Sequence, residues 1–397
     1  MGINSAALEE SAILHTYGRF PLALAKGKGS NVWDTDGNQY LDFTSGIAVC
    51  NLGHAPDSVK TALEQQLEKL WHCSNLYHIP PQEELASLLV KNSFGDYVFF
   101  CNSGAEANEA AIKLARRYAR KISGSSTAEI ITFKQSFHGR TMGAMAATGQ
   151  DKIHDGFHPL LEGFRYLEYN DGSALEEIAA SNACAVLLEL VQGEGGVVPA
   201  NLEWVRKLEE ICKEKGILLI IDEVQTGIGR TGTLFAYEQY GIKPDIMSLA
   251  KGLGSGFPIG AMIATREAAK GFEPGSHGST FGGNPLASVA GLATVTTILS
   301  DNLLEDASKL STLLDEGLAK LKEKHPSIKK VRGMGLLKGL EVNGSALDIV
   351  KAAMDEHVLL LTAGPNVVRI LPPLTATSGE AASFLGALDK VLTNMYE

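Results

Sequence analysis

Cysteine is scarce in this chain: its 397 residues include five cysteines, which are scattered and show neither C-x-x-C nor C-x-H spacing. An odd, dispersed set of this kind excludes a disulfide framework and a structural zinc site, and it favours a reducing compartment. Long apolar runs are missing too, since no segment approaches the roughly 18 apolar residues of a membrane span. The first ten residues also lack a basic region followed by an apolar one. We therefore expect no metal, no membrane span and no secretory signal, and hence a cytoplasmic protein.

Positive charge is in short supply as well. The chain has 35 lysines and arginines against 46 aspartates and glutamates, which gives a formal net charge of −11. A surface that binds nucleic acid needs clustered basic side chains, and no basic stretch with interleaved aromatic residues occurs here. We therefore expect no nucleic-acid partner. The remaining composition, 45% apolar and 20% charged, is that of a globular protein long enough for two domains.

The middle of the chain alternates between strand-like and helical patterns. That alternation predicts an α/β fold with a large, mostly parallel sheet and helices on both of its faces. The expected strands are 97–100, 129–133, 185–188, 217–221, 246–249 and 261–264, and the clearest helices are 103–122 and 202–215.

The two ends of the chain predict a smaller α+β domain. A hairpin over 31–42 turns at Asp36-Gly37, and a terminal helix begins at the capping box Thr377-Ser-Gly-Glu380. Further helices are expected at 56–71, 81–92, 285–299, 302–323 and 345–356, with short strands near 358–361 and 367–371. We expect residues 1–50 and 286–397 to form the small domain and residues 51–285 the large one.

Asp222 and Lys251 are the most informative pair of residues. Asp222 ends the apolar run 217–221, and Lys251 follows 29 residues later in the glycine-rich segment 250–256. An aspartate there ordinarily caps a turn, and most lysines are solvated. Glycines that let the backbone approach a ligand favour a binding site instead. Pyridoxal phosphate needs both groups, an acid for its pyridine nitrogen and an amine for a Schiff base.

A dinucleotide site is the rival interpretation, because Gly227-Ile-Gly-Arg-Thr-Gly232 fits the pattern G-x-G-x-x-G. The preceding strand ends in two carboxylates, which carry the wrong sign for a pyrophosphate. The segment after Gly232 has room for only a short helix before Gly241 and Pro244, so no βαβ unit follows. We therefore reject this interpretation.

Residues 102–109, Asn-Ser-Gly-Ala-Glu-Ala-Asn-Glu, follow a strand and open a long helix. Ser103 and Glu106 form a capping box, which by itself marks only a helix start. The free N–H groups of Ser103, Gly104 and Ala105 also lie at the positive end of the helix, where a phosphate binds well.

Three other loops carry candidate side chains. Phe137 belongs either to the core or to the face of a flat ring, and Arg140 is a candidate for binding a carboxylate. His138, between them, has no partner that the sequence identifies. Glu194 lies in a tight turn after a strand, and residues 278–285 add two hydroxyl groups before a helix start.

Taken in order, these motifs resemble the class III (fold type I, subgroup II) pyridoxal-phosphate aminotransferases from Gly27 to Pro373, nearly the whole chain. The segments 102–109, 222–232 and 250–261 carry the resemblance. Residues 44–49, 52–54 and 137–141 are most similar to those of the N-acetylornithine aminotransferases. The resemblance implies a seven-stranded sheet in the large domain.

The resemblance also implies a role for each cofactor residue. Lys251 would hold the cofactor covalently and move the proton at the reacting carbon, and Asp222 would pair with the pyridinium nitrogen. The phosphate would be bound by the start of the 103–122 helix and by the partner subunit's Thr280, which makes a homodimer part of the active site. The implied cofactor-binding residues are Ser103, Gly104, Ala105, Phe137, Asp222, Glu223, Val224, Gln225, Lys251 and Thr280.

Two substrates would share the pocket, N2-acetyl-L-ornithine and 2-oxoglutarate, in a ping-pong reaction of arginine biosynthesis that releases glutamate. By resemblance, Arg369 binds the oxoacid α-carboxylate and pairs with Glu194 when the amino donor is bound. Arg140 takes the other carboxylate or that of the acetylated donor, and Tyr17 and Ser279 line the donor side.

The amino donor stays open at this point. Ornithine aminotransferases have a tyrosine where this chain has Ile47, which disfavours free ornithine. Donors such as 4-aminobutyrate, succinylornithine and succinyl-diaminopimelate remain alternatives. A pyridoxal-phosphate aminomutase needs no switch between Glu194 and Arg369, so the presence of both residues disfavours it.

Overall fold

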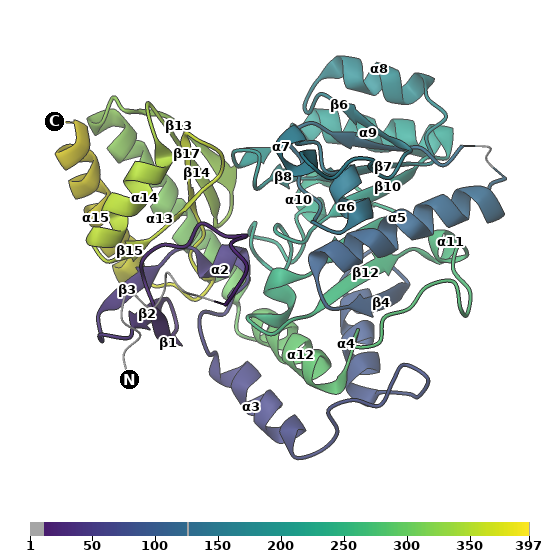
Figure 1. Cartoon of the computed structure of the whole chain (residues 1–397), viewed down its shortest axis with the longest axis horizontal. Coiled ribbons are helices and arrows are strands. Elements are labelled where there is room, and N and C mark those ends of the chain that lie inside the picture. The colour runs from purple at the N-terminus through teal and green to yellow at the C-terminus, as the bar shows by residue number, and fades with distance from the viewer. Residues whose placement is uncertain (1–11, 125–126, 397) are drawn as a thin grey trace.

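The computed structural model describes residues 12–124 and 127–396, and the chain forms two lobes (Figure 1). The larger lobe is built on a seven-stranded sheet with the order β4-β12-β11-β10-β7-β5-β6. Its strands are β4 (Tyr97–Cys101), β5 (Ile130–Phe133), β6 (Phe164–Leu167), β7 (Ala185–Glu189), β10 (Leu218–Asp222), β11 (Ile246–Leu249) and β12 (Gly260–Ala264). Only β12 runs antiparallel to its neighbours, which confirms the predicted α/β class.

The sheet is covered on both faces, which explains its continuous apolar strands. Every residue of β10 is buried. Leu218 and Ile220 pack in one core with α5 (Gly104–Lys121), whereas Leu219 and Ile221 pack in the other with α9 (Leu202–Lys215). A strand buried on both faces is apolar throughout instead of alternating with polar residues.

The remaining helices of the large lobe lie around this sheet or, like α3, pack against the helices next to it (Figure 1). Within the lobe, α12 packs against α3, α4 and the turn that begins at Lys251. This packing favours a boundary of the large domain after α12 rather than at residue 285. The helices are α3 (Asp57–Leu67), α4 (Pro80–Lys91), α6 (Met142–Ala147), α7 (Asp151–His154), α8 (Gly172–Ala180), α10 (Tyr237–Tyr240), α11 (Arg266–Ala269) and α12 (Pro285–Ser300).

The smaller lobe contains segments from both ends of the chain (Figure 1). The predicted hairpin is present as β2 (Asn31–Asp34) and β3 (Gln39–Asp42), and β3 pairs in parallel with β15 (Val358–Leu359). A second sheet has the order β13-β14-β17-β16. The other elements are β1 (Leu24–Lys28), β13 (Ile328–Met334), β14 (Leu337–Val342), β16 (Leu361–Thr362), β17 (Val367–Ile370), α13 (Leu303–Lys324), α14 (Ala346–Asp355) and α15 (Ser378–Tyr396).

Most expected elements agree with the structure to within about one residue at each end, and two differ more. The helix expected over 56–71 ends at Leu67, and the chain runs without regular structure to α4, which has proline at its start. The strand expected over 358–361 is split into β15 and β16, which belong to different sheets. Within the described ranges no single helix is long and apolar enough to span a membrane. The pair α12 and α13, which meets that test only jointly, is bent by 71°.

Candidate active site

A cavity of about 420 Å³ opens where the carboxyl ends of β5, β7 and β10 face the start of α5. This is the edge at which open α/β sheets bind ligands. The cavity brings together nine of the predicted site residues, although their positions along the sequence span about 150 residues. Those nine are Ser103, Gly104, Ala105, Phe137, Arg140, Asp222, Val224, Gln225 and Lys251.

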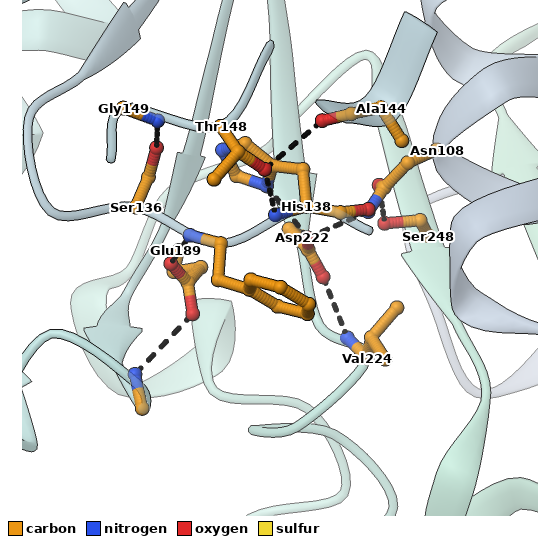
Figure 2. Close-up of polar contacts among 12 residues, drawn as sticks. Asn108, Ser136, His138, Ala144, Thr148, Gly149, Glu189, Asp222, Val224 and Ser248 are labelled. Atoms are coloured by element: carbon orange, nitrogen blue, oxygen red, sulfur yellow. Dashed lines mark hydrogen bonds and ion pairs between the residues drawn. The ribbon is translucent and has the colours of Figure 1, made fainter. Parts of the chain in front are cut away.

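Asp222 is the last residue of β10 and lies beside Glu189 of β7 and Ser248 of β11 in the sheet register. Its carboxylate is buried and accepts three hydrogen bonds (Figure 2). Oδ1 accepts from the backbone N–H of Val224 at 3.0 Å, and Oδ2 accepts from Asn108 Nδ2 at 2.7 Å. The third donor is Nδ1 of His138, at 2.8 Å from Oδ2.

Asn108 and His138 are held in turn, so the carboxylate of Asp222 is fixed in direction (Figure 2). The amide of Asn108 also donates to the backbone carbonyl of His138 at 2.7 Å, and it accepts from the hydroxyl of Ser248 at 2.6 Å. The backbone N–H of His138 donates to Thr148 Oγ1 at 2.9 Å. A charged acceptor in such a network is strongly oriented.

Lys251 follows β11 and begins a short 3₁₀ turn, with φ of +43°. Burial lowers the pKa of its ammonium from 10.5 to about 8, although the charge of Glu194 opposes this shift. A lysine with a lowered pKa is a nucleophilic amine near neutral pH. The side chain therefore has the reactivity that covalent binding of an aldehyde requires.

The first turn of α5 lies very close to the segment after Asp222. Ser103 caps the helix by accepting the N–H of Glu106 at 3.2 Å. A Cβ on Gly104 would lie 2.6 Å from Val224 Cγ1, so only glycine permits this approach. The uncovered N–H groups of this turn face the cavity that Val224 and Phe137 also line.

Glu194 and Arg369 form an ion pair beside the cavity. Arg369 is buried on β17, and its Nη1 donates to Glu194 Oε1 at 2.5 Å, to Gln225 Oε1 at 3.0 Å and to the carbonyl of Gly193 at 3.2 Å. Burial acts to raise the pKa of Glu194, but the charge and hydrogen bond of Arg369, together with the charges of Lys251 and Lys152, outweigh it and keep that pKa below its usual value. The guanidinium is therefore masked by a carboxylate that is only partly buried.

The other predicted residues lie outside this cavity in the single chain. Tyr17 is 74% exposed, and Ser279 and Thr280 belong to a partly exposed loop. The hydroxyl of Ser279 accepts from Asn102 Nδ2 at 3.3 Å. The carboxylate of Glu223 bonds to the hydroxyl of Thr226 at 2.6 Å and to two backbone N–H groups at 2.8 and 3.0 Å, so its side chain supports the chain and leaves ligand contact to its neighbours.

The donor set fits pyridoxal phosphate. An oriented aspartate suits a protonated ring nitrogen, a weakly basic lysine suits the aldehyde, and a helix N-terminus suits the phosphate. Phe137 and Val224 line the same cavity and offer apolar surface to a flat ring. Each of these groups comes from a different element of the large lobe, and all of them face one space.

Three cavity residues were not assigned to the site by the sequence analysis. Asn108, His138 and Glu189 all line the cavity. His138 had been noted without a partner, and its partner is Asp222, which lies 84 residues away in sequence. Burial raises the pKa of Glu189 to about 7, and the charge of Asp222 adds to this shift. The signal for Glu189 was available, since a carboxylate that ends an apolar run marks a strand end just as Asp222 does.

The rejected dinucleotide motif has a structural role. Arg230 is fully buried, and its guanidinium donates to Asn51 Oδ1 at 2.7 Å and to the carbonyls of Leu336 and Pro372. The helix that follows, α10, has only four residues. The loop therefore ties the large lobe to the small one, and no βαβ unit begins here.

Comparison with known proteins gives consistent results. The model of the class-III aminotransferase family matches residues 13–392. The chain is 56% identical to the acetylornithine aminotransferase of Oceanobacillus iheyensis, with 98% of each chain covered. It is 50% identical to that of Bacillus subtilis, covering 97% of this chain and 98% of the relative.

Solved structures are similar over the same length. The N-acetylornithine aminotransferase of Stenotrophomonas maltophilia is 39% identical with a TM-score of 0.84, covering 96% of this chain and 97% of that one. An ornithine aminotransferase of Toxoplasma gondii, which holds pyridoxal phosphate at partial occupancy, is 32% identical with a TM-score of 0.94 and covers 98% of this chain and 93% of that one.

Proposed function

Because the chain belongs to the class-III aminotransferases, we propose that it uses pyridoxal phosphate to transfer the distal amino group of N2-acetyl-L-ornithine to 2-oxoglutarate. The reaction would be a ping-pong exchange that yields glutamate and serves arginine biosynthesis. The five free thiols are compatible with the cytoplasm as its place.

The observation that carries this proposal is the ion pair between Arg369 and Glu194. Two chemically different substrates must use one cavity, and 2-oxoglutarate brings a carboxylate that needs a cation. A buried arginine offers a two-pronged site for that group. Glu194 neutralises the same arginine when an amino donor occupies the cavity. An aminomutase, which has one substrate, would need no such pair.

The residues of the cavity divide the chemistry between them. The bound cofactor would supply an electron sink for the reacting carbon. Asp222, oriented by Asn108 and His138, would keep the ring nitrogen protonated. Lys251 would carry the proton between the substrate carbon and the cofactor, which its lowered pKa favours.

The acetylated donor is preferred over free ornithine on two grounds. Relatives that are about half identical over the full length are acetylornithine aminotransferases, whereas the ornithine aminotransferase of T. gondii is 32% identical. Ile47 lies in the same short segment as Val49, which lines the cavity. An apolar side chain there offers no hydrogen bond to the charged α-amino group of ornithine.

A homodimer with shared active sites is part of the proposal. The segment between α3 and α4 exposes several large apolar side chains next to the loop of Ser279 and Thr280. Asn75 joins the two segments by donating to the carbonyl groups of Ser279 at 3.0 Å and Gly282 at 2.9 Å. Large exposed apolar side chains gathered on two joined segments are typical of an interface. These side chains are Trp71, Leu76, Tyr77 and Phe281, which are 59%, 88%, 70% and 61% exposed.

Visible absorption during stepwise substrate addition tests the reaction. The band of the lysine-bound cofactor should bleach with N2-acetyl-L-ornithine and return with 2-oxoglutarate. Ornithine and 4-aminobutyrate at the same concentration should act poorly. Bleaching by another donor would move the enzyme to a different substrate, and a protein that cannot be loaded with pyridoxal phosphate would contradict the proposal.

Light scattering after gel filtration tests the dimer. Leu76→Asp should yield monomers with little activity, because the partner subunit's Thr280 would no longer reach the phosphate. Leu347→Asp is the matched control, since Leu347 is an exposed leucine on α14 in the other lobe. A dimer that survives Leu76→Asp with full activity would refute this assignment of the interface.

A further inference from the structure

Glu189 connects two chain segments that face the cavity. Its side chain is buried at the end of β7. Oε2 accepts the backbone N–H of Phe137 at 2.9 Å, and Oε1 accepts that of Gly193 at 3.3 Å (Figure 2). One carboxylate thus holds the loop after β5 and the loop that carries Glu194.

The position of this carboxylate is costly for the fold. It lies beside Asp222 in the sheet register, so two acidic groups end neighbouring buried strands. Burial raises the pKa of Glu189 to about 7; the charge of Asp222 adds to this shift, and the charge of His138 opposes it. A buried acid next to another acid stabilises a fold poorly. Such groups are concentrated where a protein positions functional groups.

Gly193 is the link from Glu189 to the arginine. Its N–H is held by Glu189, and its carbonyl accepts from Arg369 Nη1 at 3.2 Å. The residue is also packed tightly, because a Cβ there would lie 2.5 Å from the amide nitrogen of Gln225. A shift of Gly193 must therefore displace one of the groups that hold Arg369.

We propose that Glu189 is a positioning residue that fixes Gly193 and thereby holds Arg369 in the orientation in which it binds the carboxylate of the oxoacid once Glu194 has moved away. This inference rests on the two-substrate function proposed above. Glu189 thereby takes part in the choice between substrates. Because Glu189 also accepts the N–H of Phe137, the same carboxylate holds the loop after β5.

Glu189→Gln separates the two hydrogen bonds. The variant keeps one oxygen, which should stay with Phe137 because that bond is the shorter one. The new NH₂ group would then face the N–H of Gly193 and release it. We expect the KM for 2-oxoglutarate to rise about tenfold, the effect of losing a hydrogen bond to a charged group. The half-reaction with the amino donor and the affinity for the cofactor should change much less.

Glu189→Ala removes both hydrogen bonds and serves as the contrast. It should raise the KM for 2-oxoglutarate and also weaken cofactor binding, because Phe137 loses its anchor. Asp245→Asn is the matched control. Asp245 is a partly buried carboxylate beside this sheet that accepts a backbone N–H, from Leu219 at 2.8 Å, and its partial burial raises its pKa. It lies at the start of β11, at the edge opposite the cavity.

The two half-reactions are measured separately by stopped-flow absorption, and thermal unfolding is followed for every variant. Equal loss in both half-reactions, in step with a fall in Tm as in Asp245→Asn, would overturn the proposal. So would an unchanged KM for 2-oxoglutarate in Glu189→Gln. If that variant does not fold, Gly193→Ala tests the same link from the other side. Its methyl group displaces Gln225, so the KM for 2-oxoglutarate should rise as in Glu189→Gln, and cofactor affinity should fall as well because Gln225 lines the cavity. An unchanged KM for 2-oxoglutarate in Gly193→Ala would overturn the proposal. Failure of the proposed reaction would be seen first in the wild-type protein, before any variant is compared.

Discussion

Replacing Lys251 by methionine should stabilise the protein that lacks its cofactor, by an amount that depends on pH. Burial lowers the pKa of this lysine in the folded state from 10.5 to about 8. Between these values the unfolded chain binds a proton that the folded chain has released. Stability therefore rises with pH across this interval, and the full cost of the partly buried ammonium is present below about pH 8.

The size of the effect follows from the gap between the two pKa values. A gap of about 2.5 pH units, between about 8 and 10.5, corresponds to about 3 kcal/mol. Lys251→Met has a similar length and no charge, so it removes this cost. We expect the variant to exceed the wild type by up to about 3 kcal/mol at pH 7, with the difference fading toward pH 10.5.

Urea unfolding of both proteins without cofactor, at several pH values from 7 to 10.5, measures this difference. All other ionisable groups are common to both proteins, so their titration cancels in the comparison. A difference that does not vary with pH would show that the lysine is not buried as a charge. A variant that is less stable at pH 7 would refute the reasoning altogether.

Three further predictions concern other parts of the structure. Gly104→Ala places a methyl group 2.6 Å from Val224 Cγ1 and should weaken cofactor binding by about 1–3 kcal/mol in a fluorescence titration. Asn108→Ala removes three hydrogen bonds, two that the amide donates at 2.7 Å and one that it accepts from Ser248 at 2.6 Å. It should lower the free energy of unfolding by about 2–4 kcal/mol and lower kcat more than it changes KM. Thr377→Ala breaks the capping box of α15 and should cost about 1 kcal/mol in urea unfolding, with kcat unchanged as its internal check.

The large sheet was predictable because its strands are buried on both faces. Runs such as 217–221 are apolar throughout and end abruptly at a charged residue, which locates both the strand and the edge where the site lies. The capping box at Thr377 was predictable for a similar reason. Its two reciprocal bonds, from the N–H of Glu380 to Thr377 Oγ1 at 3.2 Å and from the N–H of Thr377 to Glu380 Oε2 at 2.7 Å, involve neighbours in sequence alone.

Half-exposed strands were not predictable in this way. β13 begins Ile328-Lys-Lys and pairs with β14 around a tight turn at Gly335. Its only fully buried residue is Ile328, so the local pattern carries no apolar run. β6 was missed for a related reason, since three of its four residues are partly exposed at the edge of the sheet.

The site itself was only partly visible in the sequence. Residues that act through their own chemistry, such as Lys251 and Asp222, stand in motifs. The roles of the residues that hold them are not visible in the sequence, even for Asn108, which stands in a motif. The partners of Asn108 and Glu189 are set by strand register, which joins β7, β10 and β11 side by side. The sequence pattern predicts where each strand ends. Only the register of the paired strands determines which of these ends lie next to each other.

The segment 45–48 shows most clearly why long-range contacts decide the rest. All four residues, from Ser45 to Ala48, have positive φ, between 45° and 67°. A left-handed conformation costs roughly 1–2 kcal/mol for each residue with a side chain, so no local pattern predicts it. The turn is held from outside: the hydroxyl of Ser45 donates to the carbonyl of Leu371 at 2.6 Å, across 326 residues of sequence. Leu371 follows β17, the strand that carries Arg369. A strained turn near the cavity and the arginine that pairs with Glu194 therefore depend on the same junction between the two ends of the chain.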